Sequence, residues 1–209
     1  MNNPVIIGKA TIYNCDCMEL LKATPDKFYD LAIVDPPYGI GVNQMNMGSR
    51  KTVKPTSKNW DNNVPSDEYF IELRRVAKNQ IIWGGNYFKL PPSQYFAIWD
   101  KGETMYGRDF AEMEFAWVSA GGTRIFKLSP NQLDRFHPTQ KPVKLYEWLL
   151  TNYAKQGDKI LDTHLGSGSH AIACNNLGFE LTACELDKDY YEASIKRIKQ
   201  ATAQERLFA

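Results

Sequence analysis

The 209-residue sequence has few residues of the kinds that build disulfides and metal sites. It contains four cysteines and three histidines, and neither set has the paired spacing of a zinc site. Cys15 and Cys17 are one residue apart, while Cys174 and Cys184 lie far along the chain. A secretory signal and an apolar run near twenty residues are both missing, which argues against secretion and a transmembrane helix. We therefore expect a reduced, cytoplasmic protein without a resident metal ion.

The sequence also lacks a strong net charge. Its formal charge is +1, so no global field draws it to a polyanion. The charge is unevenly placed, however, because residues 41–60 contain four basic residues and no acid, and residues 122–144 are again basic. Two such stretches on a neutral chain indicate a cleft that follows a phosphate backbone, with a solvated lysine-rich loop as the alternative for the first stretch. The basic residues of the first stretch are Arg50, Lys51, Lys54 and Lys58.

No repeat, low-complexity tract or linker divides the chain. Its length and 43% hydrophobic content suffice for one core, so we expect a single domain over residues 1–209. Alternating strand and helix patterns predict an α/β fold with a mainly parallel sheet and helices on both faces. Strands are expected near 5–13, 30–34, 79–83, 94–99, 112–118, 123–127, 158–162 and 179–184, with 95–99 and 115–118 as an antiparallel pair. Helices are expected near 17–23, 67–77, 142–154, 169–177 and 188–200, with N-caps at Asp16, at Ser66 or Asp67, and at Asp187.

The segment Asp35-Pro36-Pro37-Tyr38 carries the strongest functional signal. It follows the apolar run 31–34, which predicts a buried parallel strand, and its two prolines end that strand. A carboxylate, a stiff carbonyl and an aromatic ring are thus held at a strand's C-terminal end, where α/β sheets bind ligands. This corner suits a flat substrate with an exocyclic amino group, whose N–H bonds Asp35 and the Pro36 carbonyl accept while Tyr38 covers its ring. An ordinary Pro-Pro turn is the alternative.

Residues 162–169, Asp-Thr-His-Leu-Gly-Ser-Gly-Ser, form the second functional segment, between a predicted strand and a predicted helix. Gly166 and Gly168 let the backbone pass close to a ligand, and the helix N-terminus offers N–H groups to an anion. Glu185, nineteen positions after Gly166, is placed to bind two ribose hydroxyls. The pattern fits a nicotinamide dinucleotide and S-adenosylmethionine equally well, or a glycine-rich turn that binds nothing. Asp162 favours S-adenosylmethionine, because a carboxylate there can meet the amino group of a methionine moiety.

Together these segments resemble the amino DNA methyltransferases, which methylate N6 of adenine or N4 of cytosine. The match is to the permuted group, in which the catalytic tetrapeptide precedes the glycine motif, and it spans nearly the whole chain. Residues 14–18 are similar to the family's short Asp-Cys element, residues 81–88 to a strand and turn, and residues 137–142 to the segment before the cofactor motif. The resemblance implies a Rossmann-like methyltransferase sheet with one reversed strand near its edge, S-adenosylmethionine as cofactor, and DNA as substrate with the target base flipped.

The resemblance also implies residue roles. Asp16 contacts the cofactor adenine, and Lys141 or its neighbours line the methionine side. Asp35 favours adenine over cytosine, because a serine more often opens the tetrapeptide of cytosine N4 enzymes. The implied catalytic residues are Asp35, Pro36, Pro37 and Tyr38. The implied cofactor-binding residues are Asp16, Lys141, Asp162, Gly166, Ser167, Gly168, Ser169 and Glu185.

Two positions depart from the family pattern. Thr163-His164 stand where Pro-Phe is common, and Ser169-His170 where two threonines are usual. Ser169 keeps a hydroxyl that can cap the following helix. His164 places a titratable ring where an aromatic contact to the cofactor is expected.

The irregular stretch 41–63 is long for a connection in a compact domain, and it follows the catalytic tetrapeptide directly. We expect it to close over DNA, with Arg50, Lys51, Lys54 and Lys58 on phosphates. Without a separate target-recognition domain, sequence reading falls to this loop, to residues 100–136 or to a partner subunit, and a homodimer is compatible with the sequence. Two other classes stay open: a nicotinamide-dinucleotide oxidoreductase built on the Gly166 pattern, and a nucleic-acid-binding module of the same fold without catalysis.

Overall fold

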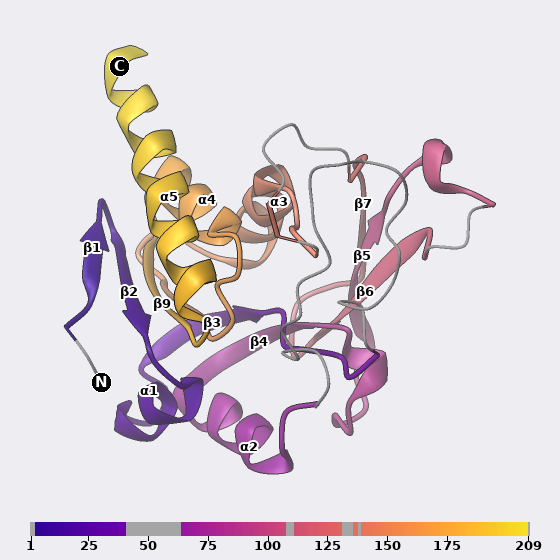
Figure 1. Cartoon of the computed structure of the whole chain (residues 1–209). Helices are drawn as coiled ribbons and strands as arrows, with labels where there is room; N and C mark the ends of the chain where they lie inside the picture. Colours follow the sequence, from indigo (N-terminus) through magenta and orange to yellow (C-terminus); the bar gives the residue numbers. More distant parts are fainter. Residues whose placement is uncertain (1–2, 41–63, 108–110, 131–135, 138, 209) are drawn as a thin grey trace.

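The computed structural model describes residues 3–40, 64–107, 111–130, 136–137 and 139–208, with side chains through residue 203. One sheet runs through this part of the chain, in the strand order β1-β2-β9-β8-β3-β4-β6-β5-β7 (Figure 1). Its strands are β1 (Val5–Ile7), β2 (Ala10–Asn14), β3 (Tyr29–Val34), β4 (Ala77–Trp83), β5 (Tyr95–Asp100), β6 (Met113–Val118), β7 (Arg124–Lys127), β8 (Lys159–Asp162) and β9 (Glu180–Glu185). The helices are α1 (Cys17–Ala23), α2 (Asp67–Val76), α3 (Val143–Tyr153), α4 (Ser169–Leu177) and α5 (Lys188–Phe208). None of these described helices combines the length and apolarity needed to cross a membrane.

The sheet is mainly parallel, as predicted. The central strands β2, β9, β8, β3 and β4 all run in one direction. Strand β6 runs against both of its neighbours, β4 and β5, which confirms the predicted antiparallel pair and the reversed strand near one edge. The parallel centre matters for function, because it brings the C-terminal ends of neighbouring strands to one edge of the sheet.

The N-terminal region corrects one prediction. Residues 5–13 were expected to form one strand, but they form a hairpin in which β1 pairs antiparallel with β2 and becomes a second reversed strand. Gly8 turns the chain at a φ of +58°, and the N–H of Lys9 donates to Asn175 Oδ1 over 3.0 Å. Apolar residues continue on both sides of this turn, so hydrophobic periodicity alone does not reveal it.

Helices cover both faces of the sheet, which confirms the predicted layers. On strand β4, Ile81 and Trp83 point to the side of α3, α4 and α5, where they join Leu149 in one buried cluster. The intervening Ile82 points to the opposite side and joins Leu73 of α2 in a second cluster with α1. Alternate residues of a strand face opposite sides of a sheet, so a run of successive apolar residues, like 81–83 of β4, belongs between two helical layers.

Three helices start at the predicted caps. Asp16 accepts a hydrogen bond from Met18 N over 2.8 Å at the start of α1, and Ser66 caps α2. Asp187 accepts from two backbone N–H groups at the start of α5. Helix α4 differs, because its N-cap is Gly168 in the left-handed region and no side chain caps it. The expectation that Ser169 caps this helix is therefore wrong.

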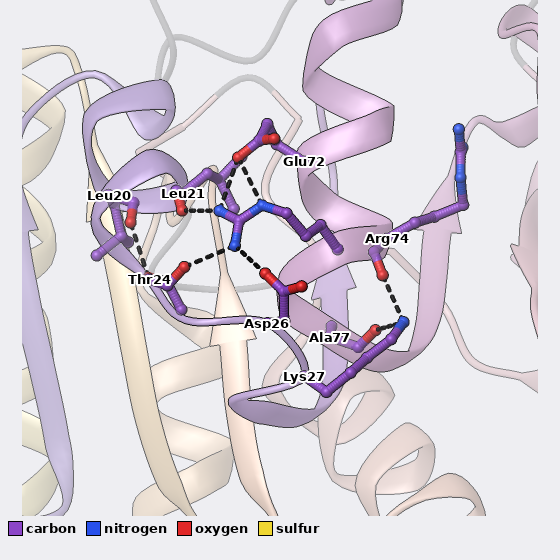
Figure 2. Close-up of polar contacts among 9 residues, drawn as sticks. Leu20, Leu21, Thr24, Asp26, Lys27, Glu72, Arg74 and Ala77 are labelled. Carbon is purple, nitrogen blue, oxygen red and sulfur yellow. Dashed lines mark hydrogen bonds and ion pairs between the residues drawn. The ribbon is translucent and has the colours of Figure 1, made fainter.

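Arg75 of α2 contacts the end of α1 through the labelled Leu21 and Thr24 of Figure 2. Its guanidinium donates to the carbonyl groups of Leu21 and Thr24 over 2.8 and 2.9 Å, and it lies 2.7 Å from Asp26. The carbonyl end of a helix carries partial negative charge, so a cation there is stabilising. The Lys27 amine likewise donates to carbonyl groups at the end of α2, over 2.6 and 3.1 Å. These contacts fix α2 against the turn that precedes β3.

Candidate active site

A cavity of about 540 Å³ opens at the C-terminal ends of β2, β9, β8 and β3, four adjacent strands. Its volume lies in the range of sites for small organic ligands, and its position is the one where parallel α/β sheets bind them. The residues that line it are 15–17, 35, 37, 137, 139–141, 146, 163–167, 185–188 and 190.

Asp35 follows β3 and carries two close contacts. Its Oδ1 accepts a hydrogen bond from the Tyr38 hydroxyl over 2.7 Å, and its Oδ2 lies 2.6 Å from Lys141 Nζ. Burial raises the pKa of Asp35, and the charge of Lys141 opposes that rise. For Lys141, 3% exposed, burial lowers the pKa, but the charges of Asp35 and Glu114 outweigh it and raise the value. The structure therefore brings Asp35, Tyr38 and Lys141 together.

Glu114 in β6 belongs to the same cluster and was not predicted. Its Oε2 lies 3.1 Å from Lys141 Nζ, and its Oε1 lies 2.8 Å from Lys101 Nζ. Burial by itself would raise the pKa of Glu114, but Lys141 and Lys101 together lower it to about 2. In the sequence Glu114 is a single acid in a strand, and only the antiparallel pairing of β6 brings it beside the site.

The Tyr38 ring is held by the turn after β4. It stacks on Tyr87 with a centroid distance of 5.0 Å and an interplanar angle of 14°. Gly84 adopts a φ of +65°, and a Cβ at this position would collide with the Tyr38 ring. The glycine is thus required both by its own backbone and by the close approach of the tyrosine.

Glu185 ends β9 beside the glycine segment. Its Oε2 accepts from Gly166 N and its Oε1 from Asp187 N, each over 2.9 Å. Burial raises the pKa of Glu185, and the two N–H groups oppose the rise. Gly166 has a φ of +52°, which suits glycine. Glu185, Gly166 and Ser167 all line the cavity, as does Asp16 from the start of α1.

Asp162, whose contact with the cofactor stays a prediction, lies behind the residues that line the cavity. It is 2% exposed, its Oδ1 accepts from His164 N over 3.0 Å, and its Oδ2 lies 2.9 Å from His170 Nδ1. His170 in turn stacks on Tyr146 with a centroid distance of 4.7 Å. The histidine that departs from the family pattern therefore holds the carboxylate, and Asp162 supports the loop from behind.

Gly168 and Ser169 also lie outside the cavity lining. A Cβ on Gly168 would lie 2.9 Å from the Ile198 side chain, so this glycine is needed for the packing of α5, and its contact with the cofactor stays a prediction. The Ser169 hydroxyl lies 3.1 Å from Ser167 Oγ and accepts from Arg197 over 2.9 Å. Both residues position the loop that carries Gly166.

His164 lines the cavity as an uncharged ring. Its Nδ1 lies 2.9 Å from Thr163 Oγ1, and its ring meets Tyr69 edge to face at 5.5 Å. Burial lowers the pKa of His164 to about 4, although the charges of Asp162 and Asp16 act in the opposite direction. At neutral pH the side chain therefore has the aromatic, neutral character expected at this position of the family.

Two prolines of the tetrapeptide and the basic loop complete the predicted site residues. Pro37 lines the cavity, and Pro36 is buried beside it. Tyr190 was missed by the sequence, and it packs on His137 at the cavity wall with a centroid distance of 4.4 Å. The loop 41–63 lies outside the described residues. With it lie the predicted DNA contacts Arg50, Lys51, Lys54 and Lys58.

A family model for N6 and N4 methyltransferases, described as DNA methylase, matches residues 92–196, half of the chain. The chain belongs to this DNA methylase family. The match contains Glu114, Lys141, the glycine segment and Glu185, and it begins after Asp35. It therefore includes Gly166 and Glu185 of the cavity lining and three members of the ion-pair cluster, Lys101, Glu114 and Lys141.

Two curated relatives in the same family are type II methyltransferases. M2.DpnII of Streptococcus pneumoniae is 36% identical over 91 residues, which cover 44% of this chain and 32% of that protein. M.HpaI of Haemophilus parainfluenzae is 36% identical over 62 residues, covering 30% of this chain and 20% of that protein. The aligned part of this chain thus spans at most about a third of either relative.

Solved structures of DNA methyltransferases share the fold. The M1.HpyAVI–SAM complex superposes with a TM-score of 0.61 at 20% identity, covering 90% of this chain and 98% of that one. The cytosine-N4-specific PvuII DNA methyltransferase gives 0.61 at 13% identity, covering 94% and 92%. TTHA0409 of Thermus thermophilus, a DNA modification methylase by its description, gives 0.57 at 16% identity, covering 94% and 96%. These likenesses confirm the methyltransferase-type α/β fold.

Proposed function

We propose that this chain transfers a methyl group from S-adenosylmethionine to the exocyclic amino group of a flipped base in DNA, with N6 of adenine as the favoured target. The observation that carries the proposal is that Asp35 and Glu185 line one cavity, from strands separated only by β8. Membership in the DNA methylase family supports the activity. A relative in fold, TTHA0409, has been solved in complex with S-adenosyl-L-methionine, which supports the cofactor over a nicotinamide dinucleotide.

The residues at the cavity fit this cofactor. Glu185 offers carboxylate oxygens for ribose hydroxyls, and Asp16 offers a carboxylate for the amino group of adenine. His164 contributes a neutral ring to the cavity wall, and Gly166 keeps the wall free of a side chain. When bound, S-adenosylmethionine supplies an electrophilic methyl group on a positively charged sulfur.

Asp35 would act on the amino group of the target base. The amino nitrogen of adenine shares its lone pair with the ring and is a poor nucleophile. Hydrogen bonds from its N–H groups to Asp35 and to the Pro36 carbonyl favour a pyramidal nitrogen with an available lone pair. Acceptors that are already oriented contribute to transition-state stabilisation, and the Tyr38 hydroxyl and Lys141 hold this carboxylate in place. Asp35 need not be a strong base, because the alkylated nitrogen is acidic enough to lose its proton.

Tyr38 would receive the flipped base. A base inside a duplex cannot reach a buried carboxylate, so it has to leave the stack, at a cost of a few kcal/mol. The Tyr38 ring already rests on Tyr87, and Gly84 closes against it, so it provides a firm stacking surface. Firm positioning of the acceptor base supports catalysis by orientation.

The nature of the base is the finer part of the proposal. The aspartate that opens the tetrapeptide favours adenine, while the likeness in fold to the cytosine-N4-specific PvuII enzyme supports cytosine N4 as the second candidate. Both bases present an amino group beside a ring nitrogen, so the same residues could act on either.

Incubation with DNA and labelled S-adenosylmethionine, followed by nucleoside analysis, tests the proposal. We expect N6-methyladenine with the wild-type chain and no methylated base with Asp35→Ala, which should still bind the cofactor. Detection of N4-methylcytosine alone would change the proposed target base to cytosine and leave the proposed mechanism unchanged. A chain that binds S-adenosylmethionine and DNA but never methylates would support a silent nucleic-acid-binding module instead.

A further inference from the structure

Four charged side chains of alternating sign are joined by three successive ion pairs that begin at Asp35 in the cavity. Asp35 follows β3, Lys141 precedes α3, Glu114 lies in β6, and the last lysine, Lys101, follows β5. The successive nitrogen–oxygen distances are 2.6, 3.1 and 2.8 Å. The two acids and two lysines balance in charge, which is what a poorly solvated cluster requires.

Lys141 is shared between two acids, and this sharing matters for Asp35. In the structure both oxygens of Asp35 are engaged, Oδ1 by the Tyr38 hydroxyl and Oδ2 by Lys141. The proposed reaction needs an Asp35 oxygen to accept an N–H of the target base. An ammonium group with a single buried partner cannot release that partner cheaply, whereas one with a second acid 3.1 Å away can.

The surroundings favour a Lys141 that stays charged while it changes partner. Its ammonium group lies 5.1 Å from the centre of the Trp83 ring and 5.9 Å from that of Tyr38, so two aromatic faces stabilise the cation. Lys101 in turn holds the far oxygen of Glu114 at 2.8 Å. Glu114 is thus anchored on one side and offers its other oxygen to Lys141.

We propose that Glu114 is a positioning residue that acts on Asp35 through Lys141, by serving as the second counter-ion when the amino group of the target base engages Asp35. The inference rests on the proposed methyl transfer. Glu114 touches neither substrate nor cofactor in this scheme; it sets the strength with which Lys141 holds the acceptor carboxylate. Without it, Lys141 binds Asp35 alone and competes with the base.

Glu114→Gln tests this, because it removes the charge and keeps the shape. We expect kcat to fall roughly a hundredfold, the size of effect that misplacement of an acceptor produces, while S-adenosylmethionine affinity stays within about twofold. Since the variant leaves two lysines against one acid, the double variant Lys101→Met/Glu114→Gln restores the charge balance and should show the same loss of kcat. Glu103→Gln is the control, because Glu103 also pairs with a lysine but is 82% exposed.

Titration of Asp35 separates positioning from a merely structural role. The groups that face Asp35 are Lys141, Glu114, Tyr38 and, from α3, Tyr146. The Glu114 charge raises the pKa of Asp35, so its removal should lower that pKa and move the acid limb of the kcat profile to lower pH. Carbon-13 NMR of the cofactor-free protein measures the same shift without any turnover.

The outcomes are distinct. Wild-type kcat in the charge-balanced double variant, or an Asp35 pKa unchanged in folded Glu114→Gln, would overturn the role of Glu114. Parallel losses of kcat, cofactor affinity and melting temperature would also overturn it, because they indicate a structural defect. A wild-type chain that methylates no DNA would overturn the proposed function, while the NMR titration would still report whether Glu114 controls Asp35.

Discussion

The Tyr38 hydroxyl donates a hydrogen bond to Asp35 Oδ1 over 2.7 Å, so two residues of the same tetrapeptide are coupled before any substrate is present. From the sequence, Tyr38 is expected to act through its ring, which covers the ring of the target base. In the structure the Tyr38 hydroxyl also orients the Asp35 carboxylate.

Tyr38→Phe should therefore lower kcat by about tenfold, because a hydrogen bond to a charged group contributes roughly 1.5–3 kcal/mol and part of it is compensated by water. Tyr38→Ala should lose far more, since the stack on Tyr87 disappears as well. Single-turnover methyl transfer with labelled S-adenosylmethionine measures both. Equal activity of Tyr38→Phe and wild type would show that the ring alone matters.

Gly84→Ala should impair catalysis by pushing the Tyr38 ring away. The matched control is Gly107→Ala, because Gly107 has a similar φ of +71° but a Cβ at this position would meet nothing within 4 Å. Both variants carry the strain of a positive φ, at roughly 1 kcal/mol or more, and Gly84→Ala should lose more stability in thermal unfolding because its Cβ also displaces the Tyr38 ring. Only Gly84→Ala should lose kcat; if both retain it, the close approach of Gly84 and Tyr38 is unimportant.

Glu185→Gln should weaken S-adenosylmethionine binding by roughly tenfold to a hundredfold, because it replaces a charged acceptor of hydrogen bonds with a neutral one. The fold should persist, and isothermal calorimetry gives the affinity. Glu180→Gln, at the exposed start of the same strand, serves as the control and should bind like wild type. Normal binding by Glu185→Gln would remove this residue from the cofactor site.

The low pKa of His164 predicts a pH-dependent stability. The pKa of about 4 in the folded protein lies below the ordinary value of 6.5. Between these two pH values the unfolded chain therefore binds a proton at His164 that the folded chain does not bind. The free energy of unfolding should accordingly decrease as pH falls from 6.5 toward 4. His164→Phe should remove this component and keep cofactor binding at neutral pH. Urea denaturation at several pH values tests it, and an identical pH dependence in the variant would contradict it.

Neutralising the four basic residues of the run 41–60 should weaken DNA binding and flatten its salt dependence. Each lost phosphate contact lowers the slope of log K against log salt by about 0.9. Cofactor affinity should stay unchanged. An unaltered slope would identify the run as ordinary solvated surface. The control neutralises exposed lysines near the amino ends of strands, at the edge of the sheet opposite the cavity: Lys9, Lys78, Lys155 and Lys159.

Much of the fold was accessible from the sequence because its signals are local. The helices 17–23 and 169–177 begin and end as expected, and the acid caps at Asp16 and Asp187 are formed. Turn and cap chemistry depends on neighbouring residues, so a single sequence records it. The hairpin at Gly8 was not predicted, because its two strands continue one apolar pattern in the sequence.

Only those site residues that belong to recognisable sequence motifs could be predicted. Asp35, Lys141 and Glu185 meet at the cavity, but Glu114 joins them through a strand pairing that no local pattern encodes. The surroundings of Asp162 show the same limit. Its partner His170 lies eight positions away on α4, and only the packed structure shows that this histidine contacts the carboxylate.

The contacts of Arg75 bear on which segments of this chain tolerate a change of length. Within the described residues, Arg75 and Lys27 fasten α2 directly to the turn before β3. Doubling the length of a flexible connection costs only about 0.6 kcal/mol in closure entropy. We therefore expect β3 and α2 to keep their relative positions when residues 41–63 are lengthened, shortened or exchanged for the corresponding segment of a relative.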